Sequence, residues 1–318
     1  MSGAMKYAVL APVAANTTAD PEWIAGFARH AEACGFESVV VVEHTVVISR
    51  YSSVYPYDSS GRMELPDDCD IPDPLDLLAF LAGRTSRIGL ATGVLVLPNH
   101  HPVVLAKRLA TVDALSGGRL RVCVGMGWMK EEIEACGTDF ATRGRRADEQ
   151  IRVMRALWAG GGPDGVDHGV DHGVDHGVDH GVDHGVDHHG EFFHFDGAMT
   201  YPKPVRGTVP VHIGGHSVAA ARRAGRLGDG FQPLGVVGDD LRRLLGVMRA
   251  EAEACGRDPG ALELTLGHLV SRITPEKAAS LASLGAGRIL LSPTPTADLA
   301  AATDELSACA ARLGLTPR

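Results

Sequence analysis

Long apolar runs, blocks of basic residues and paired cysteines are all missing from this sequence. No apolar segment approaches the ~18 residues that a membrane-spanning helix needs. Residues 1–12 lack the basic and apolar regions of a secretory signal. Lysine and arginine are dispersed and the formal net charge is −9, so we expect no nucleic-acid partner. These absences predict a cytoplasmic protein that acts on a small molecule, away from the membrane.

The six cysteines are scattered along the chain, and none forms a Cys-x-x-Cys pair: Cys34, Cys69, Cys123, Cys136, Cys255 and Cys309. Isolated cysteines in a long chain are typical of a reduced cytosolic protein and not of a disulfide scaffold or a zinc site. We therefore expect buried free thiols and no metal centre.

The sequence does contain a regular alternation of short β-branched runs and longer helical patterns. The run ESVVVVEH at 37–44 has the unbroken valines of a strand buried on both faces. The segment 20–35 starts with Asp20 and Pro21 and ends with Gly35, the usual cap residues of a helix. Further strands are expected at 6–12, 87–98, 119–127, 209–215, 230–232, 262–267 and 288–292. Further helices are expected at 73–85, 101–116, 143–160, 217–228, 237–255, and from near Pro275 and Ala297.

Eight such units favour an α/β fold, the closed (β/α)8 TIM barrel, as a single domain over residues 1–318. A doubly wound open sheet is the alternative. However, the Gly-x-Gly-x-x-Gly turn of dinucleotide-binding folds does not follow the first strand. We expect one inserted hairpin near 190–203.

Two segments interrupt the alternation. Residues 45–72 are irregular and polar and include three tyrosines, and so long a loop in a compact enzyme is usually a lid or binding loop. Residues 165–188 repeat Gly-Val-Asp-His six times. Glycine disfavours a helix and one valine in four cannot build a core, so we expect a dispensable repeat within a surface loop. The alternative is a metal-binding tract, because Asp and His are good ligands.

The stretch VGMGWMKEEIEACGTDFATRGRRADEQIRVMRALW at 124–158 closely resembles the luciferase-like superfamily, in the branch of coenzyme F420-dependent oxidoreductases. Four other stretches are similar to the same family: VVVVEH, ATGVLVLPNHHPVVLAKRLATVDALSGGRL, YPKPV and HIGGHSVAAARRAGRLGDGF. The resemblance covers nearly the whole chain outside 45–72 and 160–190. It implies a TIM barrel, a deazaflavin or FMN coenzyme, and a homodimer.

Active sites of TIM barrels lie at the C-terminal ends of the strands, and Glu43 and His44 end the second strand. In the family, a His or acidic residue here lies near the reactive carbon of the coenzyme and moves a proton as hydride moves. Neighbours on a strand point to opposite sides, so we expect only one of the two to face the coenzyme. The alternative for each is a structural role.

The third strand contains Thr92, Gly93 and Val94. The resemblance implies a bulge here, often with a non-proline cis peptide, which supports the coenzyme ring. Gly93 would let the backbone approach a flat ring closely. The alternative is a glycine in an ordinary buried strand.

The fourth strand ends in Gly125, Met126 and Gly127, which allow a tight turn beside the coenzyme. Some family members carry a glutamate where Trp128 stands, which puts that acid role in doubt here. The following Glu131 and Glu132 are expected to cap the next helix or form salt bridges.

Gly214, Gly215, His216 and Ser217 join the fifth strand to its helix. A glycine turn that leads into a helix N-terminus can bind phosphate through its oriented N–H groups. A plain tight turn is the alternative. Three arginines at the start of an earlier helix could pair with an anionic coenzyme tail or remain solvated: Arg143, Arg145 and Arg146. His100 and His101 are expected to cap the next helix and to pack there. They do not predict a metal site, because no third ligand has a compatible spacing.

These residues predict a deazaflavin-dependent oxidoreductase that transfers hydride between the coenzyme and a small organic substrate. One alternative is an FMN-dependent monooxygenase of the same superfamily, which reacts with oxygen. Another is a non-catalytic barrel that binds a metal or a partner. Fold alone does not decide among them.

Overall fold

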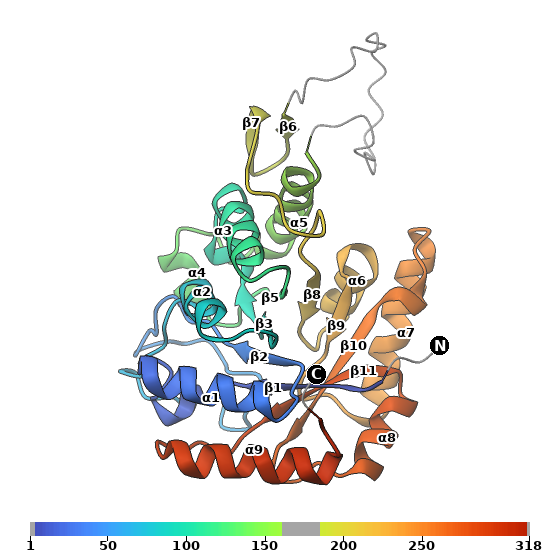
Figure 1. Ribbon diagram of the computed structural model, residues 1–318. Coiled ribbons are helices and arrows are strands. Elements are labelled where there is room, and N and C mark those ends of the chain that lie inside the picture. Colours follow the sequence, from blue (N-terminus) through green and yellow to red (C-terminus); the bar gives the residue numbers. More distant parts are fainter. Residues whose placement is uncertain (1–3, 161–184, 317–318) are drawn as a thin grey trace.

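The computed structural model describes residues 4–160 and 185–316, which form a closed parallel barrel surrounded by helices (Figure 1). The strands pair in the order β3-β2-β1-β11-β10-β9-β8-β5-β4, and an additional pairing of β3 with β5 closes the ring. The short β3 and β4 are two parts of one barrel strand, interrupted at 93–94, so the barrel has eight strands. The predicted (β/α)8 fold is confirmed.

The barrel strands follow the predicted runs, but most are shorter, the strand at 230–232 has the predicted bounds, and the last two are longer. They are β1 (Lys6–Leu10), β2 (Ser38–Val41), β3 (Gly89–Thr92), β4 (Leu95–Val96), β5 (Leu120–Gly125), β8 (Val211–Gly214), β9 (Gly230–Gln232), β10 (Glu263–Leu269) and β11 (Ala286–Ser292). All of their pairings are parallel. Their outward side chains pack under the helices, which explains the unbroken apolar character of the strands.

The helices start where capping residues predict. Asp20 accepts hydrogen bonds from the first-turn N–H groups of α1, and Asp73 does the same for α2. The helices are α1 (Pro21–Ala33), α2 (Pro74–Arg84), α3 (Pro102–Leu115), α4 (Lys130–Ala135), α5 (Arg143–Ala159), α6 (Val218–Leu227), α7 (Gly238–Ala254), α8 (Pro275–Ser283) and α9 (Leu299–Leu313). No helix in the described ranges is long and apolar enough to cross a membrane.

The inside of the barrel is divided into three layers along its axis. An apolar layer fills the middle and comprises Ala8, Val40, Ala91 and Leu290. The N-terminal ends of the strands carry charged side chains, among them Arg121 and Arg288. The C-terminal ends carry glycines, at 93, 125 and 214. The C-terminal mouth is therefore the end at which backbone can approach a flat ligand.

An antiparallel hairpin beside α5 consists of β6 (Val186–His189) and β7 (His194–Ala198) (Figure 1). It begins before the predicted position 190, so the last Gly-Val-Asp-His copy, at 185–188, belongs to this hairpin and not, as expected, to a surface loop. A side-chain contact joins this copy to α5, where His188 Nε2 lies 3.0 Å from Glu149 Oε1. The other five copies, at 165–184, lie outside the described residues.

All six cysteines are free, as expected, but only Cys123 and Cys309 are buried. The expectation of uniform burial is wrong for a local reason. Cys34, Cys136 and Cys255 are each the C-cap residue of a helix, and helix ends lie near the surface of this barrel. Among the described residues, no group of three or more His, Cys, Asp or Glu side chains is arranged to hold a metal ion.

Candidate active site

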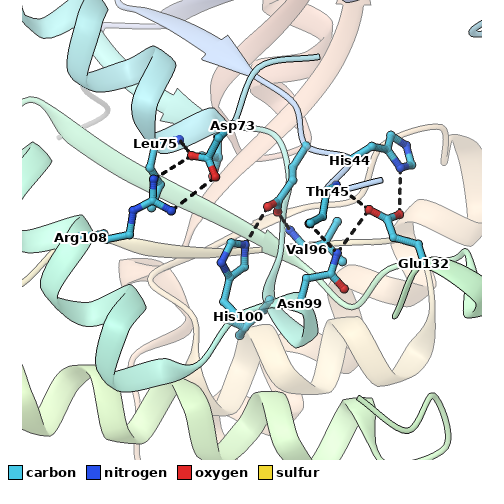
Figure 2. A network of polar contacts seen from close by, with 12 residues as sticks. His44, Thr45, Asp73, Leu75, Val96, Asn99, His100, Arg108 and Glu132 are labelled. Atoms are coloured by element: carbon cyan, nitrogen blue, oxygen red, sulfur yellow. Dashed lines mark hydrogen bonds and ion pairs between the residues drawn. The ribbon is translucent and has the colours of Figure 1, made fainter. Parts of the chain in front are cut away.

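A histidine–glutamate pair stands at the mouth of the barrel. His44 follows β2, and its Nδ1 lies 2.9 Å from Oε2 of Glu132 in α4 (Figure 2). The other carboxylate oxygen of Glu132 accepts hydrogen bonds from the Thr45 backbone N–H, at 2.7 Å, and from the Asn99 amide, at 3.3 Å. Glu132 is 2% exposed, and the side chain of His44 is 12% exposed. Because a carboxylate accepts hydrogen bonds, this contact favours the His44 tautomer that has its proton on Nδ1.

Glu43 points to the other side of the strand, as the alternation predicts. It is 5% exposed, and it accepts hydrogen bonds from the Val96 backbone N–H and from His100, whose Nε2 lies 2.7 Å away. Both oxygens are therefore engaged within the protein. Through these bonds Glu43 ties the end of β2 to β4 and to the residues before α3, a geometry that favours a structural role for Glu43.

The floor of the mouth is the side chain of Val94. The peptide bond between Gly93 and Val94 is cis, as the resemblance implies. A Cβ added at Gly125 would lie 2.6 Å from Val94 Cγ2, and one added at Gly214 would lie 2.5 Å from Val94 Cγ1. These two strand ends must therefore be glycine for the valine to occupy this place. Gly93 is equally restricted, because its Cβ would lie 2.5 Å from Val40.

A buried amide donor adjoins this floor. Gln232 ends β9 and is 1% exposed, yet its Nε2 has no hydrogen-bond partner among the described residues. A Cβ at Gly93 would lie 3.6 Å from that nitrogen. A buried donor without a partner is costly, and a carbonyl oxygen of a flat heterocycle would satisfy it. The floor and this donor together fit an isoalloxazine or deazaflavin ring, which offers both a flat face and carbonyl groups.

The turn after β8 leads into α6. Gly215 has φ +123°, and the Ser217 hydroxyl accepts a hydrogen bond from the Ala220 N–H at 3.1 Å. This cap uses one N–H of the first turn, and helix geometry leaves others of that turn without intrahelical partners. They face the exposed end where His216 lies, so the turn can receive a phosphate.

The sequence between residues 5 and 310 matches the family model of the luciferase-like monooxygenases. The chain belongs to this family. An F420-dependent glucose-6-phosphate dehydrogenase from Mycolicibacterium fortuitum is 30% identical over 246 residues, which make up 75% of this chain and 61% of that relative.

Two solved structures share the fold of this luciferase-like protein. A monooxygenase from Streptomyces bottropensis superimposes with a TM-score of 0.71 and 20% identity over 97% of this chain and 98% of that one. An F420-dependent secondary alcohol dehydrogenase, in complex with an F420–acetone adduct, has a TM-score of 0.72 and 17% identity over 97% of this chain and 99% of that one. At such identities these structures establish the fold alone.

Three other residues that are predicted to contact the coenzyme also have structural roles in this luciferase-like chain. The hydroxyl of Thr92 bonds the backbone of Cys123 in both directions, at 2.8 and 3.0 Å, and ties β3 to β5. Met126 packs against the core. Gly127, with φ +71°, makes the turn into α4. These residues shape the mouth without offering it a polar side chain.

An aromatic cluster connects the two sides of the mouth, and it comes largely from the loop 45–72. The ring of Trp128 lies 5.4 Å from that of Tyr51, 5.0 Å from that of Tyr55 and 6.3 Å from that of His44. Tyr57 extends the cluster to His216, at 5.2 Å. The loop thus lies against the side chains that flank the mouth.

Glu131 fastens this loop, because its carboxylate accepts hydrogen bonds from the backbone of Ser52 and Ser53 and from the Ser53 hydroxyl, at 2.6 to 3.2 Å. These bonds, that from the Ser53 hydroxyl foremost, lower the pKa of Glu131 to about 2, so the carboxylate is ionised at neutral pH. The salt-bridge or capping role expected of Glu131 therefore becomes an anchoring role for the loop.

The three arginines at the start of α5 are engaged by neighbours. The guanidinium of Arg143 lies over Phe140, that of Arg146 over Phe192, and Arg145 pairs with Glu191. The structure therefore favours a packing role for these arginines over the pairing with an anionic coenzyme tail that the sequence also allowed.

Sequence reasoning missed two residues of the site. The sequence predicted only a capping or salt-bridge role for Glu132. Its partner His44 lies 88 positions away, and no local pattern predicts the pair. Gln232 had an available signal, since it is the last residue of a predicted strand and strand ends line the mouth of a barrel.

Proposed function

We propose that this protein is a deazaflavin-dependent oxidoreductase, which uses coenzyme F420 to transfer hydride to or from a small organic substrate. Support comes from the F420-dependent dehydrogenase that is 30% identical to it, and from the fit of the mouth to a flat carbonyl-bearing ring. An FMN-dependent monooxygenase is the second candidate, supported by the name of the family and by the monooxygenase of similar fold.

The observation that carries the proposal is the pair of His44 and Glu132, at 2.9 Å, beside a floor made for a flat ring. When bound, the deazaflavin supplies or accepts the hydride. His44 Nε2 would hold the proton that the substrate oxygen gains or loses. Glu132 would keep the ring in one tautomer and orientation and offset the positive charge that His44 acquires. The protein thereby contributes a proton and its placement.

Three parts of the site would hold the coenzyme. Val94, with the glycines beside it, would support the ring, and the Gln232 amide would donate to a ring carbonyl. The turn at Gly215 and Ser217 would bind a phosphate of the coenzyme tail through backbone N–H groups. F420 and FMN both have a flat ring with carbonyl groups and a phosphate, so which of the two binds more tightly must be measured.

A competitive titration tests the coenzyme. The full-length protein is titrated with oxidised F420 and with FMN, and binding is followed by equilibrium dialysis and coenzyme fluorescence. Tighter binding of F420 is expected. Tighter binding of FMN, with fast reoxidation of the reduced complex by oxygen, would contradict the proposal and establish the monooxygenase.

The role of His44 is tested by the His44→Ala variant, with a substrate panel that begins with a secondary alcohol and glucose 6-phosphate. A general acid–base group typically contributes ~10²–10⁴-fold in rate, so we expect a loss of kcat in that range while the Kd for the coenzyme changes little. Glu132→Ala should lower kcat about 10- to 100-fold, and Glu132→Gln should recover part of that loss. Glu134→Gln, which changes an exposed carboxylate of α4 paired with Lys130, is the matched control, with kcat nearly unchanged. Equal kcat in wild type and His44→Ala would assign the histidine a structural role.

Two further expectations concern the protein in the cell. We propose that it is a homodimer and that it resides in the cytoplasm. Size-exclusion chromatography with light scattering measures the first, and a monomer at micromolar concentration would contradict it. Cell fractionation measures the second.

A further inference from the structure

A polar cavity lies at the opposite end of the barrel from the mouth. It has a volume of about 380 Å³ and is lined by the N-terminal ends of the strands, including Lys6, Leu120 and Glu263. The apolar middle layer of the barrel separates it from the glycine-lined mouth. The cavity is therefore a site of its own and does not belong to the coenzyme site proposed above.

Positive charge exceeds negative charge around this cavity. The cationic side chains that line it are Lys6, Arg87, Arg119, Arg121, Arg206 and Arg288, and the carboxylates are Glu32, Glu37 and Glu263. Each carboxylate already has partners in the protein. Glu37 accepts from Arg288 at 2.9 and 3.0 Å, and Glu263 pairs with Lys6 at 3.0 Å. Glu32 accepts hydrogen bonds from the backbone N–H groups of 86–88.

Arg121 is a buried cation of this cavity that makes no direct ion pair within the described residues. Its side chain points into the barrel from β5 and the residue is 8% exposed, yet within the described ranges no carboxylate lies in ion-pair contact with it. It donates one long hydrogen bond, of 3.4 Å, to the Ser38 hydroxyl, and its Nη1 has no partner in the described part of the chain. Burial, and next the charge of Arg288, lower the pKa of Arg121 to about 10, so it stays charged at neutral pH. Glu37 and Glu263 favour the charged form of Arg121 only from beyond ion-pair distance, so a bound anion would be its first counter-charge in direct contact.

His212 brings a second unsatisfied atom to the same cavity. The residue is 1% exposed, its Nδ1 has no hydrogen-bond partner among the described residues, and its Nε2 lies 3.8 Å from Glu263. Burial, together with the charges of Arg121, Arg288 and Lys6, holds the pKa of His212 well below its usual value. The imidazole is therefore neutral, and in the tautomer that carries its single proton on Nδ1 it can donate a hydrogen bond to an oxygen acceptor.

We propose that this cavity binds a small oxyanion, of the phosphate type, between the guanidinium of Arg121 and the imidazole of His212. The planar guanidinium matches two oxygens of such an anion, and the bound charge would offset the buried cation. Arg87 and Arg206 are exposed at the rim, where they would attract an anion from solution. The site would tie the stability of the barrel to the anion concentration.

The test is a calorimetric titration of the full-length protein with inorganic phosphate at constant ionic strength, with chloride as the balancing ion. Wild type should bind phosphate saturably and gain thermal stability from it. Arg121→Gln should weaken that binding about 10- to 100-fold, as expected for loss of a charged hydrogen-bond partner. Arg243→Gln, which removes an exposed arginine of α7 paired with Asp240, is the matched control and should bind like wild type.

Two results would overturn the proposal. One is the absence of saturable phosphate binding by wild type. The other is equal affinity in Arg121→Gln, which would place the phosphate elsewhere, such as the turn before α6, or show an adventitious ion only. If Arg121→Gln fails to fold, the Arg87→Gln/Arg206→Gln double variant, changed only at the exposed rim, should still weaken binding several-fold. Unchanged affinity in that double variant also counts against the site.

Discussion

The carboxylate of Glu37 gives a quantitative prediction for the pH dependence of stability. Burial alone would raise its pKa, but the hydrogen bonds and charge of Arg288 outweigh burial and lower the pKa from 4.5 to about 2. At ~1.36 kcal/mol for each pKa unit, ionised Glu37 contributes on the order of 3 kcal/mol to the free energy of unfolding at pH 7. Because the folded-state pKa is the lower one, this stability is present above about pH 4.5 and is lost as the pH falls toward 2.

The assay is urea denaturation of wild type and Glu37→Gln at pH 7, 5, 4 and 3. The difference in free energy of unfolding should be about 3 kcal/mol at pH 7 and roughly half of that near pH 3. Glu22→Gln is the control, because Glu22 is 73% exposed in its pair with Arg84, and exposed pairs contribute about 1 kcal/mol or less. A difference for Glu37→Gln that stays constant from pH 7 to pH 3 would refute the reasoning, since it would come from packing and not from ionisation.

The other predictions concern the mouth and the hairpin. Gly214→Ala should weaken coenzyme binding at least about tenfold, because the new Cβ would lie 2.5 Å from Val94 Cγ1. The Val94 side chain would have to move, and overpacking of this kind costs ~1 kcal/mol or more. Adding Val94→Ala should restore part of the affinity, and a double variant as weak as the single one would contradict the contact. Deletion of 165–184 should leave the melting temperature and the coenzyme Kd nearly unchanged, since loop length costs only ~0.6 kcal/mol per doubling. Deletion of 165–188 removes the contact to Glu149 as well, and it should lower the melting temperature by several degrees; equal melting curves for the two deletions would show that the last copy contributes nothing.

The barrel could be predicted because its signals are local. The valines of 37–44 and the caps of the helix at 20–35 lie within a few residues of one another, and each specifies its own element. The glycines at 125 and 214 could be placed at the mouth by the same reasoning, since strand ends define it.

What could not be predicted depends on contacts between distant segments. No spacing rule links His44 to Glu132, because the fold alone brings them together. The start of the hairpin was hidden by the repeat, whose identical copies gave no reason to separate 185–188 from the rest. The charge of Arg121 inside an apolar strand was a visible signal, but only the assembled ends of the eight strands show that no described carboxylate pairs with it.

The position of Trp128 gives the protein a built-in optical reporter. The chain has three tryptophans. Trp23 and Trp158 are 7% and 1% exposed, and each indole donates to a backbone carbonyl, so their emission should respond little to events at the mouth. Trp128 is half-buried against two loop tyrosines and faces the imidazole of His44. Changes of emission on ligand addition would therefore report one indole, and stopped-flow fluorescence could time the movement of the loop 45–72 without any added label.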